Sequence, residues 1–321
     1  MKFGRLNEDA AGVYIISATP FDDVGELDYA SIDRLVEFYI NSQVSGITIL
    51  GMMGEAPQLA AREAQEFLQY YIQRVADRVP VMVGVSAPGL GNLADLAHFA
   101  MDSGAAGVMV APSGGQTTEQ KLYRYMHEVN DRLGPDIPWC YQDFPQSTGV
   151  HISVELLLRA VRDFPQLVML KHEDWPGLGK LSQVRKMSEA SDTRRISILC
   201  GNGGLYLPQE LARGADGAMT GFAYPEMLVE VVRLYSEGND VEAEDLFDCY
   251  LPLVRHEQQP GFGLAIRKEI LRRRGAISHA TTRSIGPGLS TIDMRELSGL
   301  MARLEIRLLN RGGPAESMNE F

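Results

Sequence analysis

Eight short apolar segments recur along the chain, and longer amphipathic segments separate them. The apolar segments are residues 13–18, 46–50, 80–85, 107–111, 138–142, 167–171, 196–200 and 216–220. Their starts lie 20 to 34 residues apart, which leaves room for a strand, a helix and two turns in each repeat. Segments that are apolar throughout are typical of parallel strands in a sheet covered on both faces. The sequence therefore predicts an α/β fold built from strand–helix units.

The number of repeats distinguishes the two folds that fit this pattern. A closed barrel and an open doubly wound sheet both contain parallel strands that alternate with helices. Eight units with no sign of a second set of strands favour a (β/α)8 TIM barrel, with its core over residues 1–224. Residues 225–311 show only helical patterns, which predicts the eighth barrel helix plus a C-terminal helical extension, followed by a tail at 312–321. The helices predicted there are 225–237, 239–256, 262–273 and 290–310.

Charge and hydropathy exclude several classes of partner. With 30 lysine and arginine residues against 42 aspartate and glutamate residues, the formal net charge of −12 would repel the phosphate backbone of nucleic acids. No apolar run reaches the roughly 18 to 20 residues of a membrane span, and the N-terminus lacks the apolar stretch of a secretory signal. We therefore expect a cytoplasmic protein with no nucleic-acid and no membrane partner.

Neither a metal centre nor a nucleotide cofactor is indicated by the sequence. The three cysteines and six histidines show no CxxC, HxH or HxxxH spacing. No GxxxxGK[ST] loop and no strand-linked GxGxxG loop occurs to cradle a phosphate. The chain is therefore expected to work without a cofactor or a metal.

Lys171 is the most informative single residue, because reactive groups of a (β/α)8 barrel lie where the strands end. Of the six lysines in the chain, only Lys171 ends a predicted strand, directly after the apolar residues 167–170. Burial disfavours a charged ammonium and so favours the free amine that attacks carbonyl groups. The alternative is a lysine that only forms an ion pair with Glu173 or Asp174.

Two further strand ends carry groups suited to carbonyl chemistry. Tyr141 lies at the end of the preceding strand, and neighbouring parallel strands are about 4.8 Å apart. Its phenol and the Lys171 amine can therefore share one pocket and exchange protons. Gly51 and Gly54 indicate a tight turn whose backbone N–H groups suit a carboxylate. A tyrosine that only packs, and an ordinary strand-to-helix turn, remain the alternatives.

The order and spacing of these segments resemble the dihydrodipicolinate synthase and N-acetylneuraminate lyase family of Schiff-base lyases. The segments that carry the resemblance are ATPF at 18–21, GxxGE at 51–55, residues 141–145 with 148–149, Lys171, CGNGG at 200–204 and GADGAMTG at 214–221. The resemblance implies a (β/α)8 barrel with a C-terminal helical extension and a homo-oligomer, either a tetramer or a dimer. It also implies that Lys171 forms an imine with a small-molecule 2-oxo acid and that Tyr141 relays protons.

Three positions depart from the pattern of this family. Met52 and Met53 stand where the family usually carries hydroxyl groups that bind the substrate carboxylate, so only backbone N–H groups remain for that role. Residues 112–115 lack the tyrosine pair of the synthases, and Ser147 replaces the arginine that grips the second substrate's carboxylate. The 4-hydroxy-tetrahydrodipicolinate synthase reaction, which condenses pyruvate with aspartate semialdehyde, is therefore the alternative and not the main prediction.

The segments QDFP at 142–145 and GAMTG at 217–221 resemble the branch of the family that acts on 2-oxo-3-deoxy sugar acids. That branch contains dehydratases and retro-aldolases that release pyruvate, and the sequence leaves the two open. The predicted substrate contacts are Met52, Met53, Gln142, Asp143, Glu173, Gly201, Asn202 and Met219. Two interpretations of other classes remain: a non-catalytic sugar-acid-binding relative, and a protein that binds a phosphorylated sugar at residues 201–204.

Overall fold

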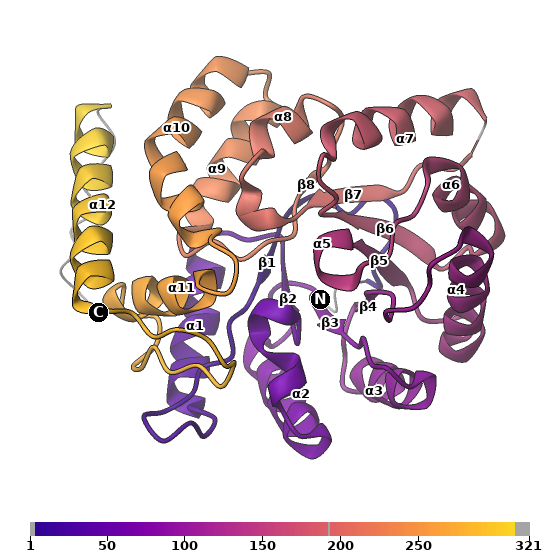
Figure 1. Ribbon diagram of the computed structural model, residues 1–321, viewed down its shortest axis with the longest axis horizontal. Coiled ribbons are helices and arrows are strands. Elements are labelled where there is room, and N and C mark those ends of the chain that lie inside the picture. Colours follow the sequence, from indigo (N-terminus) through magenta and orange to yellow (C-terminus); the bar gives the residue numbers. More distant parts are fainter. Residues whose placement is uncertain (1–3, 192, 312–321) are drawn as a thin grey trace.

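Eight parallel strands close into a barrel in the computed structural model, which describes residues 4–191 and 193–311. All eight coincide with the apolar segments that predicted them, and β8 is hydrogen-bonded back to β1, which confirms the (β/α)8 fold (Figure 1). The strands are β1 (Gly12–Ile16), β2 (Gly46–Ile49), β3 (Val81–Gly84), β4 (Gly107–Val110), β5 (Trp139–Asp143), β6 (Leu167–His172), β7 (Ser197–Cys200) and β8 (Gly217–Ala218).

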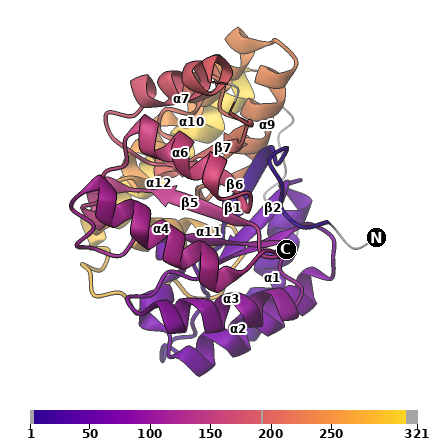
Figure 2. The same cartoon turned by 90° about the vertical axis from the view of Figure 1, so that its right-hand side faces the viewer.

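Helices follow the strands and surround them (Figures 1 and 2). The helices that follow successive strands are α1 (Tyr29–Asn41), α2 (Ala61–Val75), α3 (Leu90–Asp102), α4 (Glu119–Leu133), α6 (Val154–Asp163), α7 (Leu178–Ala190), α8 (Leu207–Leu211) and α9 (Pro225–Ser236). Short turns within the loops are η1 (Met52–Gly54), η2 (Ala56–Gln58), α5 (Pro145–Thr148) and η3 (Asn202–Gly204). No helix in the described part of the chain has the length and apolar character needed to cross a bilayer.

Three further helices follow α9, close to the bounds that the sequence predicted. They are α10 (Asp240–Glu257), α11 (Gly263–Arg273) and α12 (Thr291–Asn310). In Figure 1 these helices lie at the left-hand side, with α12 outermost and α4 and α6 on the opposite side. The division of the chain at residue 224 stays a prediction, and the predicted tail at 312–321 lies outside the described residues.

Local sequence explains where several helices begin. Asp28, Thr118 and Ser153 precede α1, α4 and α6, and each side chain accepts a hydrogen bond from a backbone N–H in the first turn. At α12, Ser290 and Asp293 form a capping box in which each side chain accepts from the other's backbone N–H. These caps satisfy N–H groups that have no partner within the helix.

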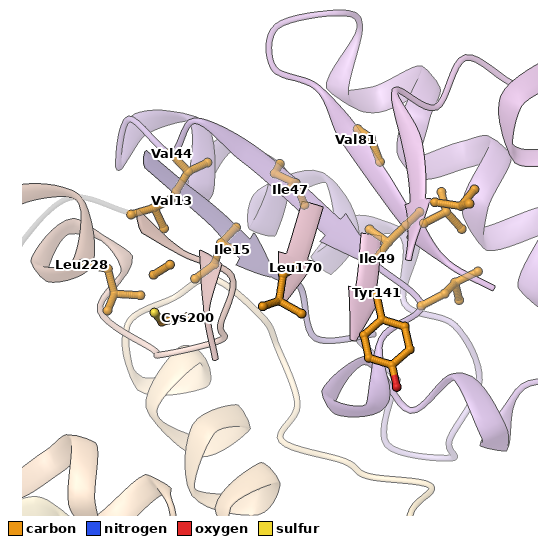
Figure 3. Packing of buried hydrophobic residues seen from close by; sticks show 14 of the residues in the cluster. Val13, Ile15, Val44, Ile47, Ile49, Val81, Tyr141, Leu170, Cys200 and Leu228 are labelled. Atoms are coloured by element: carbon orange, nitrogen blue, oxygen red, sulfur yellow. The ribbon is translucent and has the colours of Figure 1, made fainter. Parts of the chain in front are cut away.

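Strand side chains alternate between two apolar layers. One layer, which we call the lumen cluster, fills the barrel, and none of its buried members belongs to a helix. Its buried members are Leu6, Tyr14, Ile16, Met82, Met109, Cys140, Val168, Met169, Leu199 and Met219. The other layer, which we call the helix-facing layer, combines the alternate strand residues with side chains of the helices (Figure 3). Successive strand residues generally point to opposite sides, so most neighbours along a strand belong to different layers. The exception is β6, where the pairing with β5 is irregular and Val168 and Met169 both belong to the lumen cluster.

The C-terminal extension is tied to the loop that follows β2. Glu55 in this loop is fully buried, and its carboxylate accepts a hydrogen bond from Lys268 Nζ of α11 at 2.6 Å. The same carboxylate accepts the backbone N–H of Arg283 at 2.8 Å. A carboxylate can be buried in this way because an opposite charge and N–H donors compensate its desolvation. The C-terminal extension therefore stabilises the turn at residues 51–55 through these contacts with Glu55.

Candidate active site

Lys171 lies in the lumen near the C-terminal end of β6. In the sheet it stands opposite Gln142 of β5 and Leu199 of β7, and Leu199 belongs to the lumen cluster. The preceding lumen residue on the same strand is Met169. Only 7% of the Lys171 side chain is exposed. The amine therefore lies next to apolar lumen residues at the C-terminal face of the barrel. Reactive groups of this fold are found at that face.

The carboxylate of Glu173 lies beside the Lys171 amine. Glu173 Oε2 is 3.1 Å from Lys171 Nζ and accepts a hydrogen bond from Gln142 Nε2 at 2.6 Å. Glu173 Oε1 accepts a longer hydrogen bond from the backbone N–H of Asn202 at 3.4 Å. The ion pair that the sequence offered as an alternative role for Lys171 is therefore present. It also places a proton acceptor within direct reach of the amine.

A glycine at position 201 makes room for the Glu173 side chain. A Cβ at Gly201 would lie 2.2 Å from Glu173 Cγ and 2.4 Å from Oε1, so any larger residue would displace the carboxylate. Asn202, which follows, has a φ of 51°, and its side-chain amide donates to the Glu173 carbonyl at 3.1 Å. The loop after β7 thus shapes the position of Glu173 at both its side chain and its main chain.

Tyr141 does not face Lys171. In the sheet it stands opposite Leu170, and both belong to the helix-facing layer (Figure 3), whereas Cys140 and Gln142 on either side of it point into the lumen. The prediction that the phenol shares a pocket with the amine is therefore wrong, because consecutive strand residues face opposite sides. Burial raises the pKa of Tyr141 well above its usual 10, and its buried hydroxyl has no hydrogen-bond partner among the described residues.

Asp143 also lies on the helix-facing side of β5 and does not reach the lumen. Its fully buried carboxylate accepts a hydrogen bond from Lys180 Nζ of α7 at 2.6 Å, and it stands opposite His172 in the sheet. The prediction that Asp143 contacts sugar hydroxyls is therefore corrected, since strand alternation turns it the same way as Tyr141. Burial raises the pKa of Asp143 to about 6, although the nearby Lys180 ammonium opposes that rise.

The three predicted methionine contacts differ in their surroundings. Met219 is fully buried in the lumen cluster, and Met53 packs against that cluster. Met52 is 38% exposed, and its sulfur accepts a hydrogen bond from the Ser147 hydroxyl at 3.4 Å. Met52 and Met53 begin η1, where the first N–H groups have no partner within the turn. Their role as carboxylate donors stays a prediction.

Among the buried ionisable groups that the sequence did not reveal, Lys180 and Glu210 contact residues of β5 and β7. Lys180 bridges Asp143 and a second carboxylate on the helix-facing side. Glu210 of α8 lies beside the Cys200 thiol, and burial raises the pKa of Glu210 to about 8. Both residues belong to helices, so a search of strand ends does not reach them. The only signal in the sequence is a charged residue within an amphipathic segment, which is usually solvated.

The arrangement places a primary amine and a carboxylate side by side, both largely buried, at the end of β6. An amine so placed can attack a carbonyl carbon, and a carboxylate beside it can accept and return protons. In residues 4–191 and 193–311, no three histidine, cysteine, aspartate or glutamate side chains gather in a group that could hold a metal ion.

A family model described as the dihydrodipicolinate synthetase family matches residues 9–298. The chain belongs to this family. It is therefore a lyase of this family, as the sequence predicted. The alternative interpretation, a non-catalytic sugar-acid-binding relative, is rejected in favour of an enzyme.

Relatives within the family carry two different activities. L-2-keto-3-deoxyarabonate dehydratase of Azospirillum brasilense is 29% identical over 298 residues, which cover 92% of this chain and 94% of the relative. The 4-hydroxy-tetrahydrodipicolinate synthase of Methanothrix thermoacetophila is 29% identical over 76% of this chain and 80% of its own length. A crystal structure of dihydrodipicolinate synthase from Rhodopseudomonas palustris is 44% identical, with a TM-score of 0.91, and covers 94% of this chain and 100% of that one.

Proposed function

We propose that this lyase is a 2-oxo-3-deoxy sugar acid dehydratase, which forms an imine through Lys171 and moves protons through Glu173. The observation that carries the proposal is the buried pair of these two side chains in the lumen, 3.1 Å apart. The dehydratase of Azospirillum brasilense, which matches along 92% of this chain, supports the substrate class and the reaction. Retro-aldol cleavage through the same imine, with release of pyruvate, is the outcome that product analysis separates.

The proposed reaction begins when the Lys171 amine attacks C2 of the 2-oxo acid. Loss of the carbonyl oxygen as water leaves a protonated imine. Glu173 then takes the C3 proton, and the electrons of that C–H bond move toward the imine nitrogen and form an enamine. The enamine electrons expel the C4 hydroxyl, which leaves as water with the proton held by Glu173. Hydrolysis of the unsaturated imine frees Lys171 and releases the dehydrated acid.

The neighbours of the pair take roles that follow from their contacts. Gln142 donates to Glu173 Oε2 at 2.6 Å, so it fixes the carboxylate while leaving a free lone pair for the proton. Asn202 donates its backbone N–H and its side-chain amide to Glu173, so its side-chain oxygen is the group assigned to the sugar hydroxyls. The backbone N–H groups of Met52 and Met53 hold the substrate carboxylate. The side chains of Tyr141 and Asp143 do not contact the substrate, because they face the helices.

A second candidate is 4-hydroxy-tetrahydrodipicolinate synthase activity, favoured by the 44% identity to the synthase structure from Rhodopseudomonas palustris. The position that would carry an arginine for the second carboxylate is Ser147, whose hydroxyl donates to the Met52 sulfur. A neutral hydroxyl cannot replace a bidentate guanidinium–carboxylate contact. We therefore rank the dehydratase first.

Borohydride trapping tests the imine. Incubation with saturating pyruvate and borohydride, followed by peptide mass spectrometry, is expected to give a reduced adduct on Lys171 and none on Lys180. Absence of any adduct on Lys171 would refute the imine mechanism.

Product analysis tests the substrate class. A panel of 2-oxo-3-deoxy sugar acids is expected to lose water without carbon–carbon cleavage. Release of an aldehyde and pyruvate would identify a retro-aldolase instead. Turnover of pyruvate with aspartate semialdehyde, with no sugar acid consumed, would establish the synthase.

The assembly and the compartment stay part of the proposal. We infer a homo-oligomer, either a tetramer or a dimer, that acts in the cytoplasm, as the family resemblance and the sequence predict. Sedimentation velocity at micromolar concentration checks the assembly, and a single species of 35.4 kDa would contradict it.

A further inference from the structure

A buried ammonium bridges two carboxylates directly behind the reactive ends of β5 and β6. Lys180 Nζ of α7 donates to Asp143 Oδ2 at 2.6 Å and to Asp174 Oδ2 at 3.0 Å. The exposed fractions of the three side chains are 10%, 0% and 15%. Charged groups with so little contact with water interact strongly, since little solvent screens them.

The two carboxylates belong to the two residues that hold the main chain of Glu173. The backbone N–H of Glu173 donates to the Asp143 carbonyl at 2.9 Å, and Asp174 is the next residue along the chain. Lys180 therefore acts on the main chain of Glu173 indirectly, through Asp143 and Asp174, and does not contact Glu173 itself. The side chain of Glu173 leaves this segment toward the lumen, where it meets Lys171.

Few other groups near Lys180 compensate the buried charges of Asp143 and Asp174. Asp143 Oδ1 and His172 Nδ1 are both buried without a hydrogen-bond partner in the described residues, and His172 Nδ1 is 3.9 Å from Asp143 Oδ2. The other ring nitrogen of His172 is 3.1 Å from the Gly177 carbonyl. Burial lowers the pKa of His172, which disfavours the charged form of the ring. Lys180 is thus the cation that separates the two carboxylates.

The turn that leads from β6 to α7 is closely packed around Gly177. A Cβ at Gly177 would lie 2.2 Å from the Asp174 carbonyl oxygen and 2.5 Å from His172 Nε2. The loop after β6 is therefore folded closely on itself between His172 and Gly177, and Lys180 contacts this loop through Asp174.

We propose that Lys180 is a positioning residue for the reaction, which sets the place of the Glu173 carboxylate over Lys171 by bridging Asp143 and Asp174. This inference rests on the proposed function, because it assigns the proton transfer at C3 to Glu173. Without the ammonium, the buried carboxyl of Asp143 loses the group that favours its ionised form, so the bridge to Asp174 is lost and the main chain between them is free to shift. A shift of about 1 Å in a reacting group can slow its step by roughly 100-fold.

The experiment uses pyruvate, because its imine reports the two steps separately. Borohydride trapping measures imine formation on Lys171, and ¹H NMR in D2O measures exchange of the pyruvate C3 protons through the enamine. Lys180→Met is expected to keep most of the trapped adduct at saturating pyruvate and to slow C3 exchange by about 100-fold. Lys180→Arg is expected to restore much of the exchange, since it keeps the charge.

Lys186→Met is the matched control, since Lys186 lies exposed on the same helix. It is expected to match the wild type in both measurements. Wild-type exchange in Lys180→Met, or an equal loss of trapping and exchange, would overturn the inference. If thermal unfolding shows that Lys180→Met does not fold, Asp174→Asn replaces it, because the amide keeps the shape and removes one end of the bridge. Unchanged exchange in that variant also overturns the inference.

The wild type separates this inference from the function on which it rests. No trapped adduct and no exchange in the wild type refutes the imine mechanism, and the inference with it. Trapping and exchange in the wild type, together with an unaffected Lys180→Met variant, refutes the inference alone.

Discussion

The two sides of β5 and β6 differ in what they contribute, although their residues alternate along the same strands. Gln142 and Lys171 stand opposite each other and point into the lumen, where Glu173 joins them. Asp143 and His172 form the next pair and point toward the helices. Neighbouring residues on the same strand therefore differ in role: the one that points into the lumen can contact a substrate, and the one that points toward the helices can only hold the lumen residues in place. Substitutions on the lumen side should change the chemistry, and those on the helix-facing side should change stability or position.

The largest effect is expected on the lumen side for Lys171→Ala. Without the amine there is no imine, so turnover of a 2-oxo-3-deoxy sugar acid should fall on the order of 10⁴-fold or more, and borohydride should trap no adduct. The measurements are steady-state kinetics and peptide mass spectrometry. Lys186→Ala is the control, and an active Lys171→Ala variant would place the nucleophile elsewhere.

Glu173→Gln should give the next largest effect. The amide keeps the size of the side chain but cannot accept the C3 proton, so turnover should fall by about 10²–10⁴-fold. The amine of Lys171 remains, so the trapped pyruvate adduct should still form at saturating pyruvate. Loss of the adduct together with turnover would show instead that Glu173 serves imine formation.

Glu210→Gln tests a helix-facing group whose expected effect is on stability. Burial raises the pKa of Glu210 to about 8, so in the folded protein the group stays neutral over a range in which the unfolded chain is ionised. Stability linked to Glu210 is therefore present below about pH 4.5 and is lost as the pH rises toward 8. The neutral amide should remove this loss and raise the free energy of unfolding by up to about 3 kcal/mol at pH 7.

Chemical denaturation of Glu210→Gln between pH 4 and pH 8 measures this effect. Glu189→Gln, an exposed position on α7, is the matched control and should follow the wild type. An unchanged pH profile in Glu210→Gln would show that the carboxylate is already ionised in the folded protein.

The smallest effect is expected for Tyr141→Phe. Its buried hydroxyl has no partner in the described residues, so removing it should raise the free energy of unfolding by about 1 kcal/mol and leave turnover unchanged. Tyr71→Phe is a matched control, because the buried Tyr71 hydroxyl donates to Ser17 Oγ at 3.0 Å and its loss should cost about 1 kcal/mol. A large loss of turnover in Tyr141→Phe would show that the Tyr141 hydroxyl takes part in the reaction.

The contrast between the two sides also explains what the sequence could predict. The strands and the later helices follow from apolar runs and helical periodicity, which are local signals. Lys171 stands out because it is the one lysine at a strand end. The side that a strand residue faces could not be predicted in this way. Strands of a parallel barrel are apolar on both sides, so alternation alone does not tell which residues point into the lumen.

Tyr141 shows this limit most clearly. The register between β5 and β6 shifts at Trp139 and Cys140, and β5 extends to Asp143, one residue beyond the predicted end. These features decide that Gln142, and not Tyr141, stands opposite Lys171. The bridge from Lys180 to Asp143 depends on how α7 packs behind the strands, which no local pattern encodes.

The most direct test of the account compares Glu173→Gln and Tyr141→Phe in one measurement, the exchange of pyruvate C3 protons with solvent deuterium followed by ¹H NMR. We predict rapid exchange in the wild type and in Tyr141→Phe, and exchange slowed by about 10²–10⁴-fold in Glu173→Gln despite a trapped imine. Slow exchange in Tyr141→Phe together with rapid exchange in Glu173→Gln would contradict it.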